Sequence, residues 1–147
     1  MKVILLFAIV SLPIVLLGCG LANSHYLTYN FEKDKVMVAN VGAEMLNWTE
    51  MYKNDVYGTV LGTFAQTLTY SGKQGQVIKV FYREESNGYA RPSFTQELTY
   101  DISDDPVITF RNTKIKVVEA TNSLIKFVVL ESPAYQYKSG DKIKSGR

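Results

Sequence analysis

Short stretches of alternating apolar and polar residues follow one another along most of this chain. From residue 59 onward the alternation predicts six strands, at 59–71, 76–86, 93–102, 107–111, 114–120 and 124–131. The segments between them are rich in Gly, Asn, Asp, Ser and Thr, which adopt turn conformations readily. Many short strands at spacings of about ten residues are typical of antiparallel all-β domains. We therefore expect an all-β fold, an antiparallel β-sandwich or small barrel of about 7–9 strands.

The beginning of the predicted domain shows a weaker pattern. The runs 26–31 and 35–41 are rich in residues that favour strands and flank the polar connection 32–34, which predicts an opening hairpin. Segment 42–53 is ambiguous, because its Met and Trp residues recur at helical spacing while its polar composition also suits an extended strand. We leave both conformations open for this segment.

One sequence is nearly repeated 30 residues further along the chain. Segments 64–70 and 94–100 share Phe, Gln, Leu, Thr and Tyr at matching positions. Because strand side chains alternate between faces, Phe, Gln, Leu and Tyr lie on one side of each segment. This predicts two equivalent strands, either paired in one sheet or facing each other across the core. If the domain encloses a ligand cavity, we expect its lining to be Phe64, Leu68, Tyr70, Phe94, Leu98 and Tyr100.

Two glutamines interrupt the apolar faces of the repeated segments. Gln66 and Gln96 each fall between Phe and Leu, where a polar side chain must find a hydrogen-bond partner. The simpler interpretation is that each amide satisfies backbone groups of a neighbouring strand. The alternative is that each binds a ligand in a cavity.

The first apolar run of the chain has a different character from the strands. It covers residues 3–17 and follows a single positive charge at Lys2. As a helix it would span about 22 Å, which is short for a hydrocarbon core of about 30 Å. The run ends in the sequence Leu16-Leu17-Gly18-Cys19. This ending resembles the lipobox of bacterial lipoproteins, and the resemblance implies cleavage before Cys19 by signal peptidase II and acylation of its sulfur.

Two other interpretations of the run stay open, an uncleaved anchor and a conventional signal peptide. A conventional peptide needs small residues one and three positions before the cut, which Gly18 satisfies and Leu16 does not. Lipidation also accounts for the lone cysteine, which cannot form an internal disulfide. The resemblance implies a lipid-anchored protein of the cell envelope. In a Gram-negative host Gly20 favours the outer membrane, facing the periplasm, and in a Gram-positive host the anchor lies in the outer leaflet of the cell membrane.

We divide the chain into four segments. Residues 1–18 form the lipoprotein signal peptide, 19–25 the lipidated Cys and a short tether, 26–137 a single β-domain, and 138–147 a basic, disordered tail. The 16 basic and 14 acidic residues are interspersed and give a net charge of +2. A nucleic-acid-binding protein would show a basic patch or stripe, so we expect no nucleic-acid partner.

The sequence lacks the residue combinations of familiar catalytic sites. His25 is the only histidine, and its position six residues after Cys19 predicts an ordinary exposed side chain beside the membrane. Cys19 is consumed by lipid, and no Gly-x-Ser-x-Gly elbow occurs. Glu84 and Glu85 are neighbours whose side chains point to opposite faces of a strand. One His without a free Cys disfavours zinc. We expect no catalytic residue, no metal and no cofactor.

The remaining candidate for a functional site is a surface suited to contact with a partner. Loop 86–92 carries Tyr89 and Arg91, residue types that are frequent in binding interfaces, although a plain hairpin tip with Arg91 paired to Glu84 or Glu85 is the simpler interpretation. We expect a membrane-anchored envelope lipoprotein that acts through contacts with an envelope protein, as a structural or assembly accessory. The alternatives are a carrier or pilot that binds an acyl chain or other hydrophobic ligand inside the β-domain and, more remotely, a carboxylate-based hydrolase.

Overall fold

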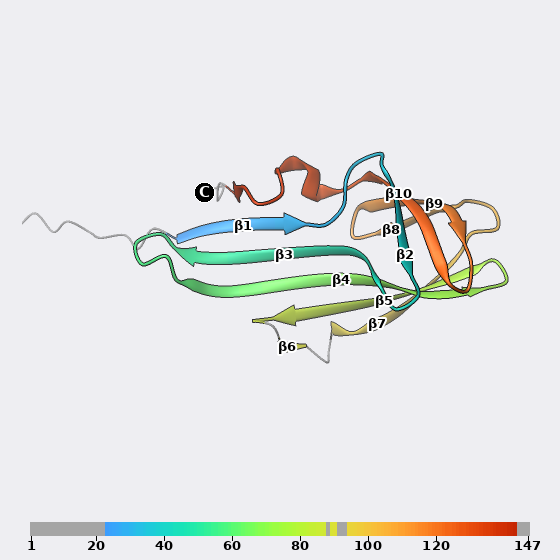
Figure 1. Ribbon diagram of the computed structural model, residues 1–147, viewed down its shortest axis with the longest axis horizontal. Helices are drawn as coiled ribbons and strands as arrows, with labels where there is room; N and C mark the ends of the chain where they lie inside the picture. The colour runs from blue at the N-terminus through green and yellow to red at the C-terminus, as the bar shows by residue number, and fades with distance from the viewer. Residues whose placement is uncertain (1–22, 88, 91–93, 144–147) are drawn as a thin grey trace, which may run out of the picture.

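Two antiparallel sheets form the computed structural model, which describes residues 23–87, 89–90 and 94–143 (Figure 1). The first sheet contains β1 (Asn23–Tyr29), β3 (Glu44–Asn54), β4 (Val60–Gln74), β5 (Val77–Ser86), β6 (Tyr89–Ala90), β7 (Gln96–Asp101) and β11 (Lys142–Ile143). The second contains β2 (Val36–Asn40), β8 (Val107–Phe110), β9 (Thr113–Ala120) and β10 (Leu124–Glu131). The predicted all-β sandwich is confirmed.

The strands are ordered β11-β1-β3-β4-β5-β6 in the first sheet, with β7 also paired to β5, and β2-β10-β9-β8 in the second. β6 and β11 have only two residues each, and the longer strands match the number expected from the sequence. A short 3₁₀ turn, η2 (Pro133–Gln136), follows β10 and leads the chain back along β1. Among the described residues, no helix is long and apolar enough to cross a membrane.

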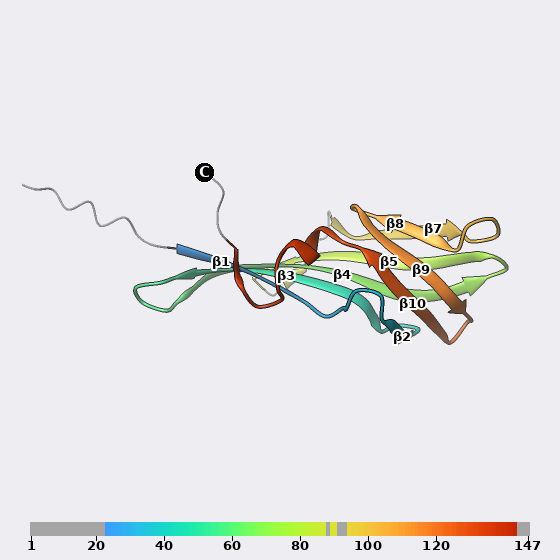
Figure 2. The same ribbon diagram turned by 90° about the horizontal axis from the view of Figure 1, so that it is seen from above.

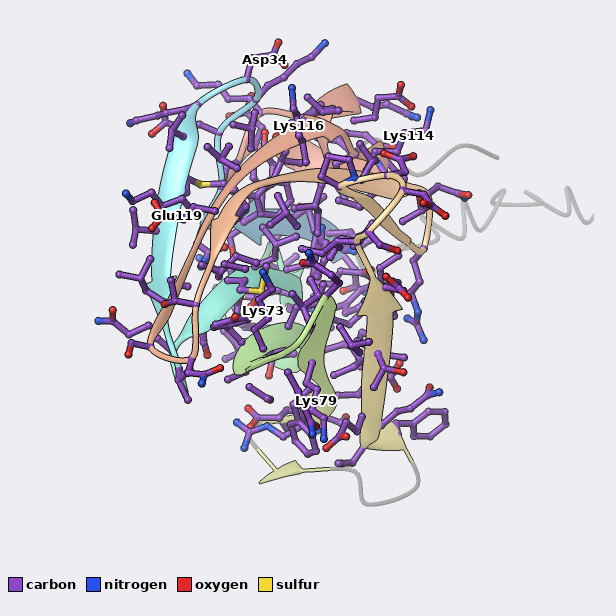
Figure 3. The ribbon with its side chains drawn as sticks, turned by 90° about the vertical axis from the view of Figure 1, so that its right-hand side faces the viewer. Asp34, Lys73, Lys79, Lys114, Lys116 and Glu119 are labelled. Carbon is purple, nitrogen blue, oxygen red and sulfur yellow. The ribbon has the colours of Figure 1, made fainter. Side chains whose placement is uncertain are left out.

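The hydrophobic core lies between the two sheets. It follows from strict alternation: in β9, Ile115 and Val117 are buried, whereas Lys114 and Lys116 lie on the outer side of the second sheet (Figure 3). Each fully buried aliphatic or aromatic side chain contributes about 1.5–3 kcal/mol to stability. The largest fully buried apolar side chains are Leu46, Leu68, Tyr70, Ile78, Val80, Ile115, Ile125, Phe127 and Val129.

The predicted opening hairpin is wrong. β1 pairs with β3 and β11 in the first sheet, whereas β2 pairs with β10 in the second, so the chain crosses between sheets after β1. Phe31 is the reason: it is buried at the crossing, with its ring centroid 5.4 Å from that of Trp48 and 5.7 Å from that of Tyr135. An apolar residue buried between the layers directs the following residues into the other sheet, beyond reach of a local hairpin.

Segment 42–53, which the sequence leaves open between helix and strand, is extended. It forms most of β3, whose pairing with β4 shifts register between Glu44 and Leu46. Met45 and Leu46 are both buried there, which a regular alternation would not allow. The irregular apolar spacing, which resembles that of a helix, therefore arises from a β-bulge in an extended strand.

The repeated segments 64–70 and 94–100 lie in the same sheet, on either side of β5. Tyr70 in β4 and Leu98 in β7 are both opposite Val80. Tyr70 matches Tyr100 in the repeat, but Tyr100 is opposite Ile78, so the two segments flank β5 with an offset of two residues. The prediction that they pair directly or face each other across the core is wrong.

The second sheet covers only one part of the first. β1, β3, β4 and β5 extend well past the ends of β8, β9 and β10, and only the C-terminal segment lies over the exposed portion (Figures 1 and 2). One end of the long sheet, with the β3–β4 turn and the start of β1, is therefore left uncovered by the second sheet.

Both ends of the predicted domain differ from expectation. β1 begins at Asn23, so the last residues of the predicted tether 19–25, including His25, belong to the sheet. The predicted disordered tail is also wrong as far as Ile143: Gly140 N donates to Leu27 O at 2.8 Å, and β11 pairs with His25 and Tyr26. These backbone bonds hold the C-terminal segment against the outer edge of β1.

Candidate functional site

A cleft of about 330 Å³ opens where the second sheet ends. Its floor is the inner face of β1, β3 and β4, and its other walls are the β8–β9 turn, η2 and the segment leading to β11. The apolar lining residues are Leu27, Trp48, Phe110, Pro133, Ala134, Tyr137 and Ile143, and the polar ones are His25, Glu50, Gln66, Arg111 and Thr113. A mainly apolar cleft with a few convergent polar groups is the usual form of a small-ligand or side-chain binding site.

The β8–β9 turn places Arg111 over the cleft. Arg111 and Asn112 both have positive φ, 45° and 62°, as the two-residue hairpin turn that suits twisted strands requires. Asn tolerates this conformation, but for Arg it costs on the order of 1 kcal/mol. Since the residue is held in this conformation, its contacts on the first sheet compensate for that cost.

Those contacts centre on a buried carboxylate. The Glu84 side chain is only 4% exposed, and its Oε1 accepts from Arg111 Nη2 at 2.9 Å and from the Tyr82 hydroxyl at 2.5 Å. Arg111 Nη1 also donates to Gln66 Oε1 at 3.1 Å. The guanidinium carbon lies 4.8 Å from the centroid of the Tyr82 ring, within range for a cation–π interaction.

The pKa of Tyr82 is raised well above its ordinary value, first by burial and then by its hydrogen bond to Glu84. Tyr82 therefore stays a hydrogen-bond donor across the physiological range. The Arg111 side chain, in contrast, is half exposed and lines the cleft, and its guanidinium has more donors than these two hydrogen bonds use.

A second polar group lines the cleft nearer the uncovered end of the sheet. His25 Nε2 lies 3.0 Å from Glu50 Oε2, and the Tyr52 hydroxyl donates to the same oxygen at 3.1 Å. The His25 ring stacks on the Tyr52 ring with centroids 4.4 Å apart, as their opposite positions in β1 and β3 allow. Burial raises the pKa of Tyr52, and Glu50 adds to the effect.

The expectation that His25 is an ordinary exposed residue is therefore wrong. It is half-buried, has a carboxylate partner and forms one wall of the cleft. The error follows from treating residues up to 25 as tether, whereas the pairing of Asn23 with Asn54 begins the strand two residues earlier.

The six residues predicted to line a cavity are not gathered around one. Leu68 and Tyr70 are packed in the core, and Leu98 and Tyr100 are partly buried against it. Phe64 is half-buried in β4, and Phe94 is 40% exposed and lines a separate pocket. The cleft is lined by other residues, because the inner face of β4 changes from core to cleft between Leu68 and Gln66.

Of the other predicted site residues, the structure describes only one. Cys19 and Arg91 are outside the described residues, and Tyr89 is in β6, opposite Ser86. The two carboxylates that the sequence offers as partners of Arg91 pair with other arginines. Glu84 binds Arg111, and Glu85 forms an ion pair with Arg83.

Sequence reasoning missed Arg111 and Glu84, although one signal was available. Val80, Tyr82 and Glu84 share the inner face of β5. The acidic Glu84 is therefore predicted to be buried, like the two residues before it on this face. Such an acid requires a cation or several donors. No group of three or more His, Cys, Asp or Glu residues within the described part of the chain is placed to hold a metal ion.

No known protein family, curated protein or solved structure matches this chain. The fold and the cleft together define an all-β sandwich with a mainly apolar cleft where the second sheet ends.

Proposed function

We propose that this protein is a lipid-anchored envelope protein that acts by binding a partner protein in the inter-sheet cleft, without catalysing a reaction. The cleft is the observation that carries the proposal. Its apolar wall, with Trp48 and Tyr137, suits an aromatic or aliphatic side chain, and the half-exposed Arg111 suits a carboxylate or backbone carbonyl beside it.

The charged side chains that line the cleft are already paired. Arg111 is bound to Glu84 and His25 to Glu50, so each ionisable group lines the cleft with a partner already in place. A site arranged in this way is preorganised to recognise shape and hydrogen bonds.

The lipid anchor is the second part of the proposal and rests on the lipobox-like sequence at Cys19. Membrane fractionation of cells that produce the wild-type chain or the Cys19→Ala variant tests it. We expect the wild-type chain in the membrane fraction and the variant in the soluble fraction. An unchanged distribution would show that the protein is held by something other than lipid on Cys19.

Site-specific photocrosslinking in the native host tests the cleft. We expect benzoyl-phenylalanine in place of Tyr137, which lines the cleft, to give a discrete crosslinked protein that disappears when Arg111→Ala is added. The matched control is the same substitution at Val118, which is exposed on the outer face of β9, and it should give no such product. A product that is equal at both positions, or that is indifferent to Arg111→Ala, would contradict the proposal.

The apolar wall also favours a second candidate, a carrier that holds an acyl chain in the cleft. A fatty acid with a photoreactive diazirine, supplied to the cells, separates the two candidates. Covalent adducts on cleft residues such as Trp48 or Tyr137 would support the carrier. Adducts that are absent from the cleft would leave protein contact as the function.

A further inference from the structure

The uncovered end of the long sheet carries an apolar tip. The tip consists of Val56, Tyr57, Val60 and Leu61, which are 64%, 75%, 55% and 54% exposed. It lies in and beside the β3–β4 turn, at one end of the long axis of the molecule (Figure 1). Single exposed apolar residues are ordinary, but four around one turn mark a contact surface.

The tip is held in a defined shape. Asn54 Oδ1 accepts from Val56 N at 3.0 Å and from Tyr57 N at 2.9 Å, and Asn54 N donates to Thr59 O at 2.8 Å. Gly58, with φ of 67°, closes the turn by donating to Asn54 O at 2.9 Å. These bonds fix the backbone, so the apolar side chains are presented outward without a further ordering cost.

The tip lies beside the point where the anchor joins the domain. Asn23, the first residue of β1, is paired with Asn54, the last residue of β3 (Figures 1 and 2). Only three residues separate Cys19 from Asn23, and the four steps from one Cα to the next span at most about 14 Å when fully extended. A lipid on Cys19 therefore keeps Asn23, and with it the adjoining tip, within about 14 Å of the bilayer.

The charges around the tip are compatible with a membrane surface. The one acid of the turn, Asp55, accepts from Ser24 Oγ and forms an ion pair with Lys142 at 3.0 Å. Its negative charge is therefore compensated within the protein. Lys53 and Lys142 are the basic residues next to the turn, in β3 and β11.

We propose that the apolar tip rests in the interfacial layer of the membrane that carries the lipid anchor. The inference rests on the anchor of the proposed function. Tyr57 and the aliphatic residues around it are the types that favour this layer. The long axis then stands away from the membrane, and the cleft faces sideways above it. Four side chains are far fewer than the roughly 20–30 residues per side of a standard protein interface, which disfavours a second copy as the occupant.

Depth-dependent quenching on the full lipidated chain tests this contact. The Cys19 thiol is blocked by lipid, so a cysteine introduced by Tyr57→Cys or Leu61→Cys is the one reactive thiol and accepts the environment-sensitive dye NBD. The labelled chain is reconstituted in vesicles of phosphatidylethanolamine and phosphatidylglycerol, with or without a spin-labelled lipid that quenches NBD within the bilayer. Val118→Cys, exposed on the second sheet, is the matched control.

We expect the spin-labelled lipid to remove most of the NBD emission at positions 57 and 61 and none at position 118. Flotation of the vesicles is measured first, because it reports on the anchor alone. A chain that floats but is not quenched at 57 or 61 overturns the contact and leaves the anchor standing. A chain that does not float overturns both.

Discussion

At the residue scale, the pair of Glu84 and Arg111 decides the stability of the cleft. Arg111→Ala would leave the buried Glu84 carboxylate with the Tyr82 hydroxyl as its remaining partner. We expect a loss of about 1–2 kcal/mol, less than for a fully buried pair because water screens the half-exposed guanidinium. Chemical denaturation followed by the fluorescence of Trp48, the single tryptophan, measures it.

The control for this variant removes the stranded charge. Adding Glu84→Gln to Arg111→Ala should recover part of the lost stability, because a neutral amide costs less to bury than an unpaired carboxylate. Lys126→Ala, which breaks an exposed ion pair with Glu119, should change stability little. Equal instability of the single and double variants would show that the charge itself is not the cause.

Two buried tyrosine hydroxyls differ in their hydrogen bonding, so their removal should affect stability differently. The Tyr70 hydroxyl donates to Thr121 O at 2.6 Å, whereas the buried Tyr135 hydroxyl has no hydrogen-bond partner among the described residues. Tyr70→Phe should therefore destabilise the fold by about 1 kcal/mol, and Tyr135→Phe should be neutral or stabilising. Thermal unfolding of the two variants side by side checks the difference, and an equal loss in both would contradict it.

The sequence predicts the position of some residues of the site but not of others. Alternation places Gln66 on the inner face of its strand, and there it binds another side chain rather than the neighbouring backbone. Arg111 could not be anticipated in the same way. It reaches Glu84 through the dihedral angles of a turn in one sheet and the packing of that turn on the other. The turn is local in sequence, but the packing of one sheet on the other is not.

At the scale of elements, the sequence predicts strands better than their partners. Segments 107–111, 114–120 and 124–131 form β8, β9 and β10 almost to the residue, because short turns connect them and each buries alternate side chains. β1 instead pairs with β3 and β11, the second of which lies more than a hundred residues further along the chain. Alternation specifies which face of a strand is buried, but it does not specify the neighbouring strand.

At this scale, a substitution at the crossing from β1 to β2 should have a large effect on stability. Phe31 is buried between Trp48 and Tyr135, so Phe31→Ala should leave a cavity at the point where β1 leads into β2. We expect a loss of about 3–5 kcal/mol in the free energy of unfolding, measured by chemical denaturation. Val36→Ala, at an exposed position of β2, is the control and should stay within about 0.5 kcal/mol of wild type. A small effect at Phe31 would mean that the crossing is held by other contacts.

At the scale of the whole molecule, the perturbed groups predict a stability plateau between about pH 4 and pH 10. Hydrogen bonds from Ser24 and Ser103 lower the pKa values of Asp55 and Asp101, so their contribution is present above the unfolded pKa and is lost as the pH falls through the folded one. Burial raises the pKa of Tyr135 to about 12, so its contribution is lost as the pH rises above about 10.

Denaturation midpoints measured across the pH range check both limits of the plateau. The double variant Asp55→Asn and Asp101→Asn should flatten the acid side and leave the alkaline side unchanged. A wild-type midpoint that falls steadily between pH 7 and pH 5 would point to groups other than these.

The long first strand also has a mechanical consequence. β1 extends along the long axis, and its seven residues are all paired with β3. The hydrogen bonds of antiparallel strands are perpendicular to them, so a pull along β1 loads these bonds together, in shear, rather than opening them one after another. If Cys19 carries the proposed lipid and a partner held in the cleft moves relative to the membrane, the tension enters the domain through β1. The strand next to the anchor is thus oriented to resist force, so that strain on the tether need not open the binding site.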